Sequence, residues 1–305
     1  MNKFSYLSIL LLLFMLATPR GMVWAQSAFI KGDGGVEFRC YAHMGKDLMH
    51  SIRQNRMVEE APGMQALREQ AMKVQESGRV EVNLLKGKKK KTATSQWVEK
   101  RRESILKVCI YKSATVRPEM VTFFATAVAL TEDGICLTNY HVLDQFINPQ
   151  AKIQPGDSLM FVATDDGRTY PITQVLSYNR LGDVALFRVD MRGEKLTPMP
   201  VGEDQPVAAT VHTLTHPESM MYYYSRGVVT RNVCDNVNDP FTCRTQITAD
   251  YAKGSSGGPI FDDYGNMIAM VSTTNSIYAQ PQTQQNLQMV VKTTIPISVI
   301  RRLIK

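Results

Sequence analysis

The sequence contains a serine flanked by glycines, Ser256, in the run Gly254-Ser255-Ser256-Gly257-Gly258-Pro259. Acyl transfer needs a nucleophile on an exposed tight turn, beside backbone N–H groups that point at the oxygen that becomes negative. Small flanking residues permit such a turn, and the amides of Gly254 and Ser256 are the candidate donors of an oxyanion hole. An ordinary glycine- and serine-rich loop would have the same composition, so the loop needs partners elsewhere in the chain.

Two further residues have the types and the local context that a serine nucleophile requires. His141 follows the apolar run that ends at Thr138, where a general base could reach a serine hydroxyl. Asp183 leads directly into the apolar run Val184-Ala185-Leu186-Phe187, where a carboxylate needs a partner and could orient the imidazole. Each residue alone has a structural explanation, but together they predict a catalytic triad of His141, Asp183 and Ser256.

The other histidines with a suggestive spacing are His212 and His216, which would lie in one strand and its turn. No cysteine or carboxylate cluster accompanies them to complete a tetrahedral metal site. We therefore expect structural histidines and no metal.

Short β-rich runs must position the candidate residues. They are separated by turns such as Glu132-Asp133-Gly134 and Asp165-Asp166-Gly167, in which glycine permits a positive φ. Regular short strands without long intervening helices predict an all-β barrel or sandwich. The expected strands are Ile105 to Tyr111, Thr122 to Leu130, Ile135 to Thr138, Ser158 to Ala163, Val184 to Val189, Thr210 to Leu214, Gly227 to Asn232, Gln246 to Thr248, Met267 to Thr273 and Gln288 to Thr294, followed by a helix over Ile297 to Ile304.

The N-terminal third of the chain differs in character from the rest. Residues 1–25 have the short apolar core and the small residue before the cleavage site that are typical of a signal peptide, which predicts an exported protein, periplasmic or secreted. Residues 26–102 form an extension, with two short amphipathic helices expected between Met44 and Gln75 and a break near Pro62.

The basic residues are concentrated at the end of this extension. The formal net charge is +7, and the segment from Lys86 to Arg102 has eight Lys and Arg residues against Glu99 alone. Contact with an anionic surface through this segment is possible, but a solvated linker is the favoured interpretation, and no nucleic-acid partner is expected. Of the five cysteines, Cys234 and Cys243 are the best candidates for a disulfide bond; free thiols are the alternative.

The segment Ala127 to Gly134, running into Leu137-Thr138-Asn139-Tyr140-His141-Val142, resembles the histidine region of HtrA-like serine proteases in the trypsin superfamily. Gly182 to Val189 resembles their aspartate strand, and Gly254 to Pro259 their nucleophile loop. The similarity runs from about Val98 to Lys305. It implies a chymotrypsin-like double β-barrel over residues 103–305, with barrels at about 103–200 and 201–305 and with the triad at their junction. It also implies that the protein needs no cofactor.

Two departures from the HtrA pattern affect the expected function. The chain ends at Lys305, so we expect no PDZ-type domain and no peptide-regulated activation through one. The nucleophile loop is one residue shorter and puts Asp250 six positions before Ser256, as in trypsin. In such relatives this acid lies near the base of the primary specificity pocket, which predicts a preference for Arg or Lys. The alternatives are that Asp250 pairs with Lys253 or satisfies loop backbone, and that the pocket takes small apolar side chains.

The sequence therefore predicts a serine endopeptidase that acts on protein or peptide substrates outside the cytoplasm. The alternative is a binding or scaffold protein with the same fold, whose loop is collapsed or gated. A further possibility is that the N-terminal extension holds the enzyme inactive or makes it trimeric.

Overall fold

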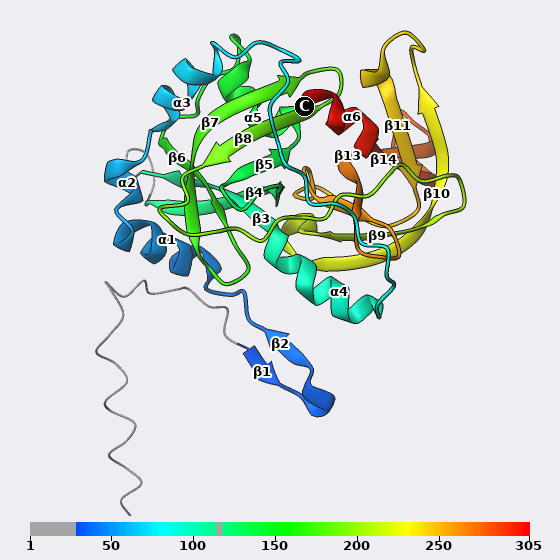
Figure 1. Cartoon of the computed structure of the whole chain (residues 1–305), viewed down its shortest axis with the longest axis horizontal. Coiled ribbons are helices and arrows are strands. Elements are labelled where there is room, and N and C mark those ends of the chain that lie inside the picture. The colour runs from blue at the N-terminus through cyan, green and yellow to red at the C-terminus, as the bar shows by residue number, and fades with distance from the viewer. Residues whose placement is uncertain (1–28, 114–117) are drawn as a thin grey trace, which may run out of the picture.

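The computed structural model describes residues 29–113 and 118–305. The expected signal peptide, residues 1–25, lies outside these ranges. Within them, no helix combines the length and the apolar character needed to cross a membrane. Two closed β-barrels lie side by side, with helices of the N-terminal extension on the outer side of the first (Figure 1). The expected double-barrel fold is confirmed.

The first barrel contains six antiparallel strands in the spatial order β3-β4-β5-β8-β7-β6, closed by pairing of β3 with β6. Alternate residues of these strands, such as Leu106 and Val108 of β3, point into one core with Val162 and Phe187. Gly134 connects β4 to β5 with a φ of +93°, a conformation that favours glycine. The strands are β3 (Ile105–Lys112), β4 (Met120–Ala129), β5 (Ile135–Thr138), β6 (Asp157–Ala163), β7 (Thr169–Asn179) and β8 (Val184–Val189).

The second barrel also has six antiparallel strands, in the order β10-β11-β14-β13-β12-β9, and β9 closes it against β10. Its core is smaller and includes Val211, Val229, Ile247 and Ile260. The strands are β9 (Thr210–Thr215), β10 (Tyr223–Cys234), β11 (Cys243–Ile247), β12 (Pro259–Phe261), β13 (Met267–Gln280) and β14 (Gln285–Pro296). Cys234 and Cys243 lie directly opposite each other in β10 and β11, and both are free thiols.

The extension packs three helices on the first barrel. These are α1 (Met44–Gln54), α2 (Met57–Glu60) and α3 (Met64–Ala71), and the expected break near Pro62 separates α2 from α3. Leu48, Ile52 and Met57 cover the outer face of the barrel at Phe161, so β3 and β6 are buried on both faces. A small hairpin, β1 (Phe29–Lys31) and β2 (Glu37–Arg39), precedes the helices and projects from the body (Figure 1).

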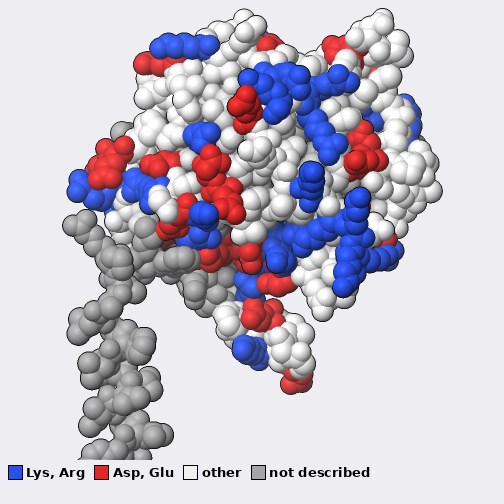
Figure 2. Space-filling view, in the orientation of Figure 1, with Lys and Arg blue, Asp and Glu red and all other residues white. Residues whose placement is uncertain are grey.

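The basic segment is not a simple solvated linker. Its second half forms a helix, α4 (Thr94–Arg101), which buries Trp97 against Phe261 at a ring-centroid distance of 5.3 Å. Arg101 is buried too, and its Nε donates to the carbonyl oxygen of Gly265 at 2.7 Å. The lysines from Lys86 to Lys91 are exposed. Figure 2 shows Lys and Arg side chains gathered on this side of the molecule. Contact with an anionic surface stays a prediction.

The C-terminal segment pairs with the extension at Val80. The short helix α6 (Ile297–Ile300) continues as a 3₁₀ turn over Arg301–Leu303, which is shorter than the expected helix to Ile304. The N–H of Val80 donates to the Leu303 carbonyl oxygen, and the N–H of Lys305 donates to the Val80 carbonyl oxygen, each at 2.9 Å. The extension therefore contacts both barrels and the C-terminal segment.

Candidate active site

His141 lies in the first turn of a helix that the sequence did not predict. Strand β5 ends at Thr138, and helix α5 (Tyr140–Ile147) begins two residues later. The helix buries Val142, Leu143, Phe146 and Ile147 in the first barrel, while His141 stays exposed. The amphipathic pattern of α5 thus fixes the backbone and directs the imidazole outward.

Asp183 occupies the turn between β7 and β8, with a φ of +53°. This left-handed conformation is costly for a non-glycine residue and persists only where surrounding contacts hold it. Its Oδ1 lies 2.9 Å from Nδ1 of His141. Its Oδ2 accepts hydrogen bonds from Nδ2 of Asn139 at 3.1 Å and from Oγ of Ser272 at 2.9 Å. The two barrels thus both contribute donors to one carboxylate.

Ser256 completes a continuous chain of contacts, because its Oγ lies 2.9 Å from Nε2 of His141. The loop that carries it is anchored to β4: the N–H of Thr126 donates to the Ser256 carbonyl oxygen at 2.8 Å, and its Oγ1 donates to the Gly254 carbonyl oxygen at 3.0 Å. Gly257 has a φ of +83°, and a Cβ there would lie 2.0 Å from the Thr126 carbonyl oxygen. The sequence-predicted Asp183 and Ser256 therefore both lie within hydrogen-bonding distance of His141, one at each ring nitrogen.

The two expected oxyanion donors belong to the same loop. Gly254 has a φ of +93°, and neither its N–H nor that of Ser256 has an acceptor among the described residues. By contrast, the N–H of Ser255 between them donates to the Ala252 carbonyl oxygen at 3.0 Å. Two unpaired N–H groups beside the nucleophile remain available to stabilise a developing negative charge.

Asp250 lies at the surface. Its side chain is 76% exposed, and its Oδ1 is 3.6 Å from Nζ of Lys292. The Asp250 carbonyl oxygen accepts hydrogen bonds from Thr213 and Ser225. Its neighbour Tyr251 is buried instead, and its hydroxyl donates toward the carbonyl oxygens of β13 and β14. The carboxylate therefore has a cationic partner, Lys292, that sequence reasoning did not name.

The remaining candidate histidines have partners within the protein. His212 contacts the hydroxyl of Tyr224 through Nδ1 at 2.8 Å and Oδ1 of Asp263 through Nε2 at 2.9 Å. His216 is buried, and its Nδ1 accepts from the N–H of Tyr222 at 3.0 Å. Burial lowers the pKa of His216 well below its ordinary value. No group of three potential metal ligands occurs in the described part of the chain.

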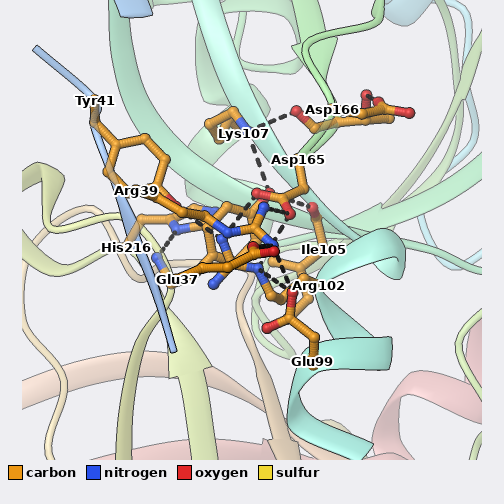
Figure 3. A network of polar contacts seen from close by, with 12 residues as sticks. Glu37, Arg39, Tyr41, Glu99, Arg102, Ile105, Lys107, Asp165, Asp166 and His216 are labelled. Atoms are coloured by element: carbon orange, nitrogen blue, oxygen red, sulfur yellow. Dashed lines mark hydrogen bonds and ion pairs between the residues drawn. The ribbon is translucent and has the colours of Figure 1, made fainter. Parts of the chain in front are cut away.

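A partly buried polar network, which sequence reasoning missed, joins the extension to the first barrel and lies beside His216 (Figure 3). Asp165 binds Arg39 at 2.8 Å and Arg102 at 3.0 Å, and Arg102 lies 4.1 Å from the centre of the Tyr222 ring. Nζ of Lys107 donates to the Tyr222 hydroxyl at 3.2 Å. The network reaches the nucleophile loop through Tyr222 and His216.

His216 in turn contacts the nucleophile loop. A Cβ at Gly254 would lie 2.7 Å from the His216 carbonyl oxygen, and the N–H of Glu218 donates to the Lys253 carbonyl oxygen at 2.7 Å. The only signal in the sequence was the turn at Asp165-Asp166-Gly167. It predicted a connection, but not the ion pairs of Asp165 with Arg39 and Arg102 or the nearby charge of Lys107.

The chain is similar to a protein family, to curated relatives and to solved structures. Residues 125–270, which include all three candidate catalytic residues, match the family described as the trypsin-like peptidase domain. The chain is HtrA-like, with a trypsin-like peptidase domain. Among curated relatives of this HtrA-like chain, Protease Do-like 1, chloroplastic, of Arabidopsis thaliana is 28% identical over 46% of the chain and 30% of the relative.

A probable periplasmic serine endoprotease DegP-like of Brucella suis is 27% identical over 46% of the HtrA-like chain and 26% of the relative. The matched segments thus span less than a third of these two curated relatives. Two solved structures share the fold. Deg5 has a TM-score of 0.51 and 18% identity, and the match covers 68% of this chain and 90% of Deg5. An HtrA-type protease with a tripeptide has a TM-score of 0.51 and 17% identity, and the match covers 68% of this chain and 61% of that protease. The expected resemblance is confirmed.

Proposed function

We propose that the protein is a serine endopeptidase in which Ser256 is the nucleophile, His141 the general base and Asp183 the orienting carboxylate. The observation that carries this proposal is the unbroken contact chain from Asp183 through His141 to Ser256, with both distances at 2.9 Å. The similarity to serine proteases supports the reaction class. The peptidase unit would be residues 103–305, with residues 26–102 as an extension.

The reaction begins with attack of Ser256 Oγ on the carbonyl carbon of the scissile peptide bond, while Nε2 of His141 takes the hydroxyl proton. Asp183 stabilises the imidazolium that forms, because its carboxylate faces Nδ1. The N–H groups of Gly254 and Ser256 donate to the negative oxygen of the tetrahedral intermediate.

Collapse of the intermediate breaks the C–N bond, and the leaving amine takes the proton from His141. Water then attacks the acyl-enzyme while His141 takes a proton from it. The C–O bond to Ser256 breaks, His141 returns the proton to Ser256 Oγ, and the carboxylic acid is released. Every step uses side chains and amides of this chain.

Labelling with a fluorophosphonate probe tests the proposal, because such a probe forms a stable bond with an activated serine. We expect labelling of the mature chain and loss of both labelling and peptide cleavage in Ser256→Ala, by about 10⁶-fold in rate. Ser95→Ala, at an exposed serine of α4, is the control and should keep both. A folded protein that neither labels nor cleaves would favour the scaffold alternative.

The preference for Arg or Lys before the scissile bond is a finer hypothesis with a specific competitor. Lys292 lies 3.6 Å from the Asp250 carboxylate and would reduce its attraction for a basic side chain. Cleavage of a peptide library distinguishes the two cases, since equal cleavage after Arg and Val would contradict a basic preference.

We further propose that the protein acts outside the cytoplasm. The signal-like residues 1–25 support this location, as does the printed name of the Brucella relative, a probable periplasmic serine endoprotease. Fractionation of expressing cells together with N-terminal sequencing tests it; a mature chain that begins at Gln26 is expected in the exported fraction.

A further inference from the structure

The chain that precedes α4, residues 85–91, is fixed against the second barrel by its main chain. The N–H of Val201 donates to the Leu85 carbonyl oxygen at 2.9 Å. The Lys88 N–H donates to Oδ1 of Asn266 at 2.6 Å, and Nδ2 of Asn266 donates to the Lys88 carbonyl oxygen at 2.9 Å. The backbone is therefore held in place, while the lysine side chains that it carries are exposed.

Most of these lysines lack an acidic partner. Lys91 forms an ion pair with Asp263 at 2.9 Å. The other lysines of the segment and the first lysine of the α4 end form no ion pair with any described residue: Lys86, Lys88, Lys89, Lys90 and Lys100. The positive charge of Arg101 lowers the pKa of Lys88, and burial and the charge of Lys100 act in the same direction. This crowded positive charge, on the side of the molecule where Figure 2 shows Lys and Arg gathered, favours an external anion.

A cleft of about 580 Å³ opens beside the segment. Its lining has four cations and two carboxylates: Lys86, Lys88, Lys89, Arg301, Glu203 and Asp262. Asp262 is already engaged, because both of its carboxylate oxygens accept hydrogen bonds from Asn266. The Arg301 guanidinium donates to the Gly202 carbonyl oxygen at 2.7 Å, a neutral partner. Positive charge therefore exceeds negative charge in the cleft.

Apolar side chains are exposed at the same cleft. Leu85 and Tyr264 line it, and they are 45% and 38% exposed. Basic residues beside an exposed aliphatic and an amphipathic aromatic side chain suit the interface of a bilayer, where cations contact phosphate and apolar groups enter the headgroup region. A soluble polyanion would use the cations alone, so Leu85 and Tyr264 favour a lipid surface.

We propose that residues 85–90, together with Lys100 and Arg301, form a docking surface for the headgroups of anionic phospholipids. The lysines supply electrostatic attraction to the phosphates, and Leu85 and Tyr264 add apolar contact with the interface. Because the backbone of the segment is fixed on the barrel, little ordering of the chain opposes binding. The surface would hold the protein reversibly at a membrane, and this role does not depend on peptidase activity.

Sedimentation with lipid vesicles tests the proposal. We expect the mature chain, which lacks the apolar residues 1–25, to bind phosphatidylcholine vesicles that contain about 30% phosphatidylglycerol at about 0.1 M NaCl. It should leave them at about 0.5 M NaCl and should not bind pure phosphatidylcholine vesicles.

A charge variant and its control localise the binding. The triple change Lys88→Gln, Lys89→Gln and Lys90→Gln should weaken binding about 100-fold, because each lysine near an anionic surface contributes roughly a factor of five. The matched control removes three exposed lysines from other parts of the chain and should change binding less than about twofold; it combines Lys46→Gln, Lys73→Gln and Lys152→Gln.

A second variant distinguishes a lipid surface from a soluble polyanion. Leu85→Ser removes apolar contact without changing charge, so it should weaken vesicle binding about fivefold and leave retention on heparin unchanged. The Leu85 carbonyl oxygen still accepts from Val201, so the backbone of the segment stays anchored.

Four outcomes would overturn the proposal. Equal binding to neutral and anionic vesicles would exclude recognition of the headgroup charge, and equal affinities of the two triple variants would place the contact elsewhere. Retention on heparin without binding to anionic vesicles would assign the surface to a soluble polyanion. Release by about 10 mM inorganic phosphate at constant ionic strength would assign the cleft to free phosphate. Fluorophosphonate labelling is expected to be the same in all these variants, so failure here leaves the proposed function unaffected.

Discussion

Ser272 Oγ donates a hydrogen bond of 2.9 Å to Oδ2 of Asp183, across the junction of the two barrels. The carboxylate that faces His141 is therefore held by a residue of the second barrel as well as by Asn139 of the first. One donor from each barrel fixes the orientation of Asp183, so the relative placement of the barrels affects the candidate triad directly.

Ser272→Ala should lower activity without abolishing it. A hydrogen bond to a charged group contributes about 1.5–3 kcal/mol, and Asn139 retains part of the orientation, so we expect a fall in kcat of about 10-fold. Kinetics with a short peptide measures the effect, and Ser272→Thr, which keeps the hydroxyl, should recover activity. Equal loss in both variants would point to packing rather than to the hydrogen bond.

Gly257→Ala should inactivate and destabilise the protein. The positive φ disfavours any side chain, and the added Cβ would lie 2.0 Å from the Thr126 carbonyl oxygen and 2.4 Å from Oγ1 of Thr138. We expect a loss of at least about 2 kcal/mol in the free energy of unfolding, measured in urea. Gly193→Ala measures the cost of the positive φ alone, because Gly193 has a φ of +84° and no atom lies within 4 Å of the added Cβ. Its cost should be about 1 kcal/mol; similar losses at both positions would contradict the steric argument.

Asp165→Asn should strongly destabilise the fold. Burial alone would raise the pKa of Asp165, but hydrogen bonding from Arg102 and the nearby positive charges lower it, so the carboxylate is ionised in the network. The amide would remove the main negative charge beside the largely buried Arg102 and the buried Lys107, leaving Arg102 only the exposed Glu99 at 3.8 Å, at a cost of about 3–5 kcal/mol.

Thermal and urea unfolding check this prediction, with Asp133→Asn as the control. Asp133 pairs with Arg188 at the surface, and its loss should cost less than about 1 kcal/mol. Comparable stability of the two variants would mean that the network at Asp165 contributes little.

The stability of the protein should rise at alkaline pH through Lys107. Burial lowers the pKa of Lys107 to about 8 from an ordinary value of 10.5. Between these values the unfolded chain binds the proton more tightly, so stability rises with pH. The contribution is fully present above pH 10.5 and is lost as the pH falls through about 8.

Urea unfolding of the wild type and of Lys107→Met over this pH range isolates the effect of Lys107 on stability. The effects of other titrating groups largely cancel when the free energy of unfolding of the variant is subtracted from that of the wild type. The wild type should gain up to about 3 kcal/mol relative to the variant, at 1.36 kcal/mol per pKa unit. Parallel pH profiles would show that Lys107 keeps its ordinary pKa in the folded protein.

Local patterns predicted an all-β barrel or sandwich and the candidate triad, and the resemblance to HtrA-like proteases supplied the double barrel. Short apolar runs with glycine turns identified strands such as β5 and β8, and His141 and Asp183 adjoin those strands. Strand β7 was missed because Pro171 and several polar residues interrupt its apolar pattern, although its pairing with β6 and β8 satisfies the backbone.

Other features depend on contacts between distant residues. Helix α4 lies in a segment whose lysines favoured a linker, and burial of Trp97 against Phe261 of the second barrel gives it a defined position. The partners of Asp165 come from the extension and from β3, and the contact between Asp250 and Lys292 joins the nucleophile loop to β14. No spacing within a local window could identify these pairs.

The meeting of Val80 with Leu303 and Lys305 sets an order of events during biogenesis. Arg79 also donates to the Ile304 carbonyl oxygen, a contact between residues 225 positions apart. Contacts of such long range are slow to form, and these cannot exist until residues 303–305 have left the ribosome. A growing chain can therefore assemble its first barrel early, but Arg79 and Val80 stay unpaired until those residues emerge.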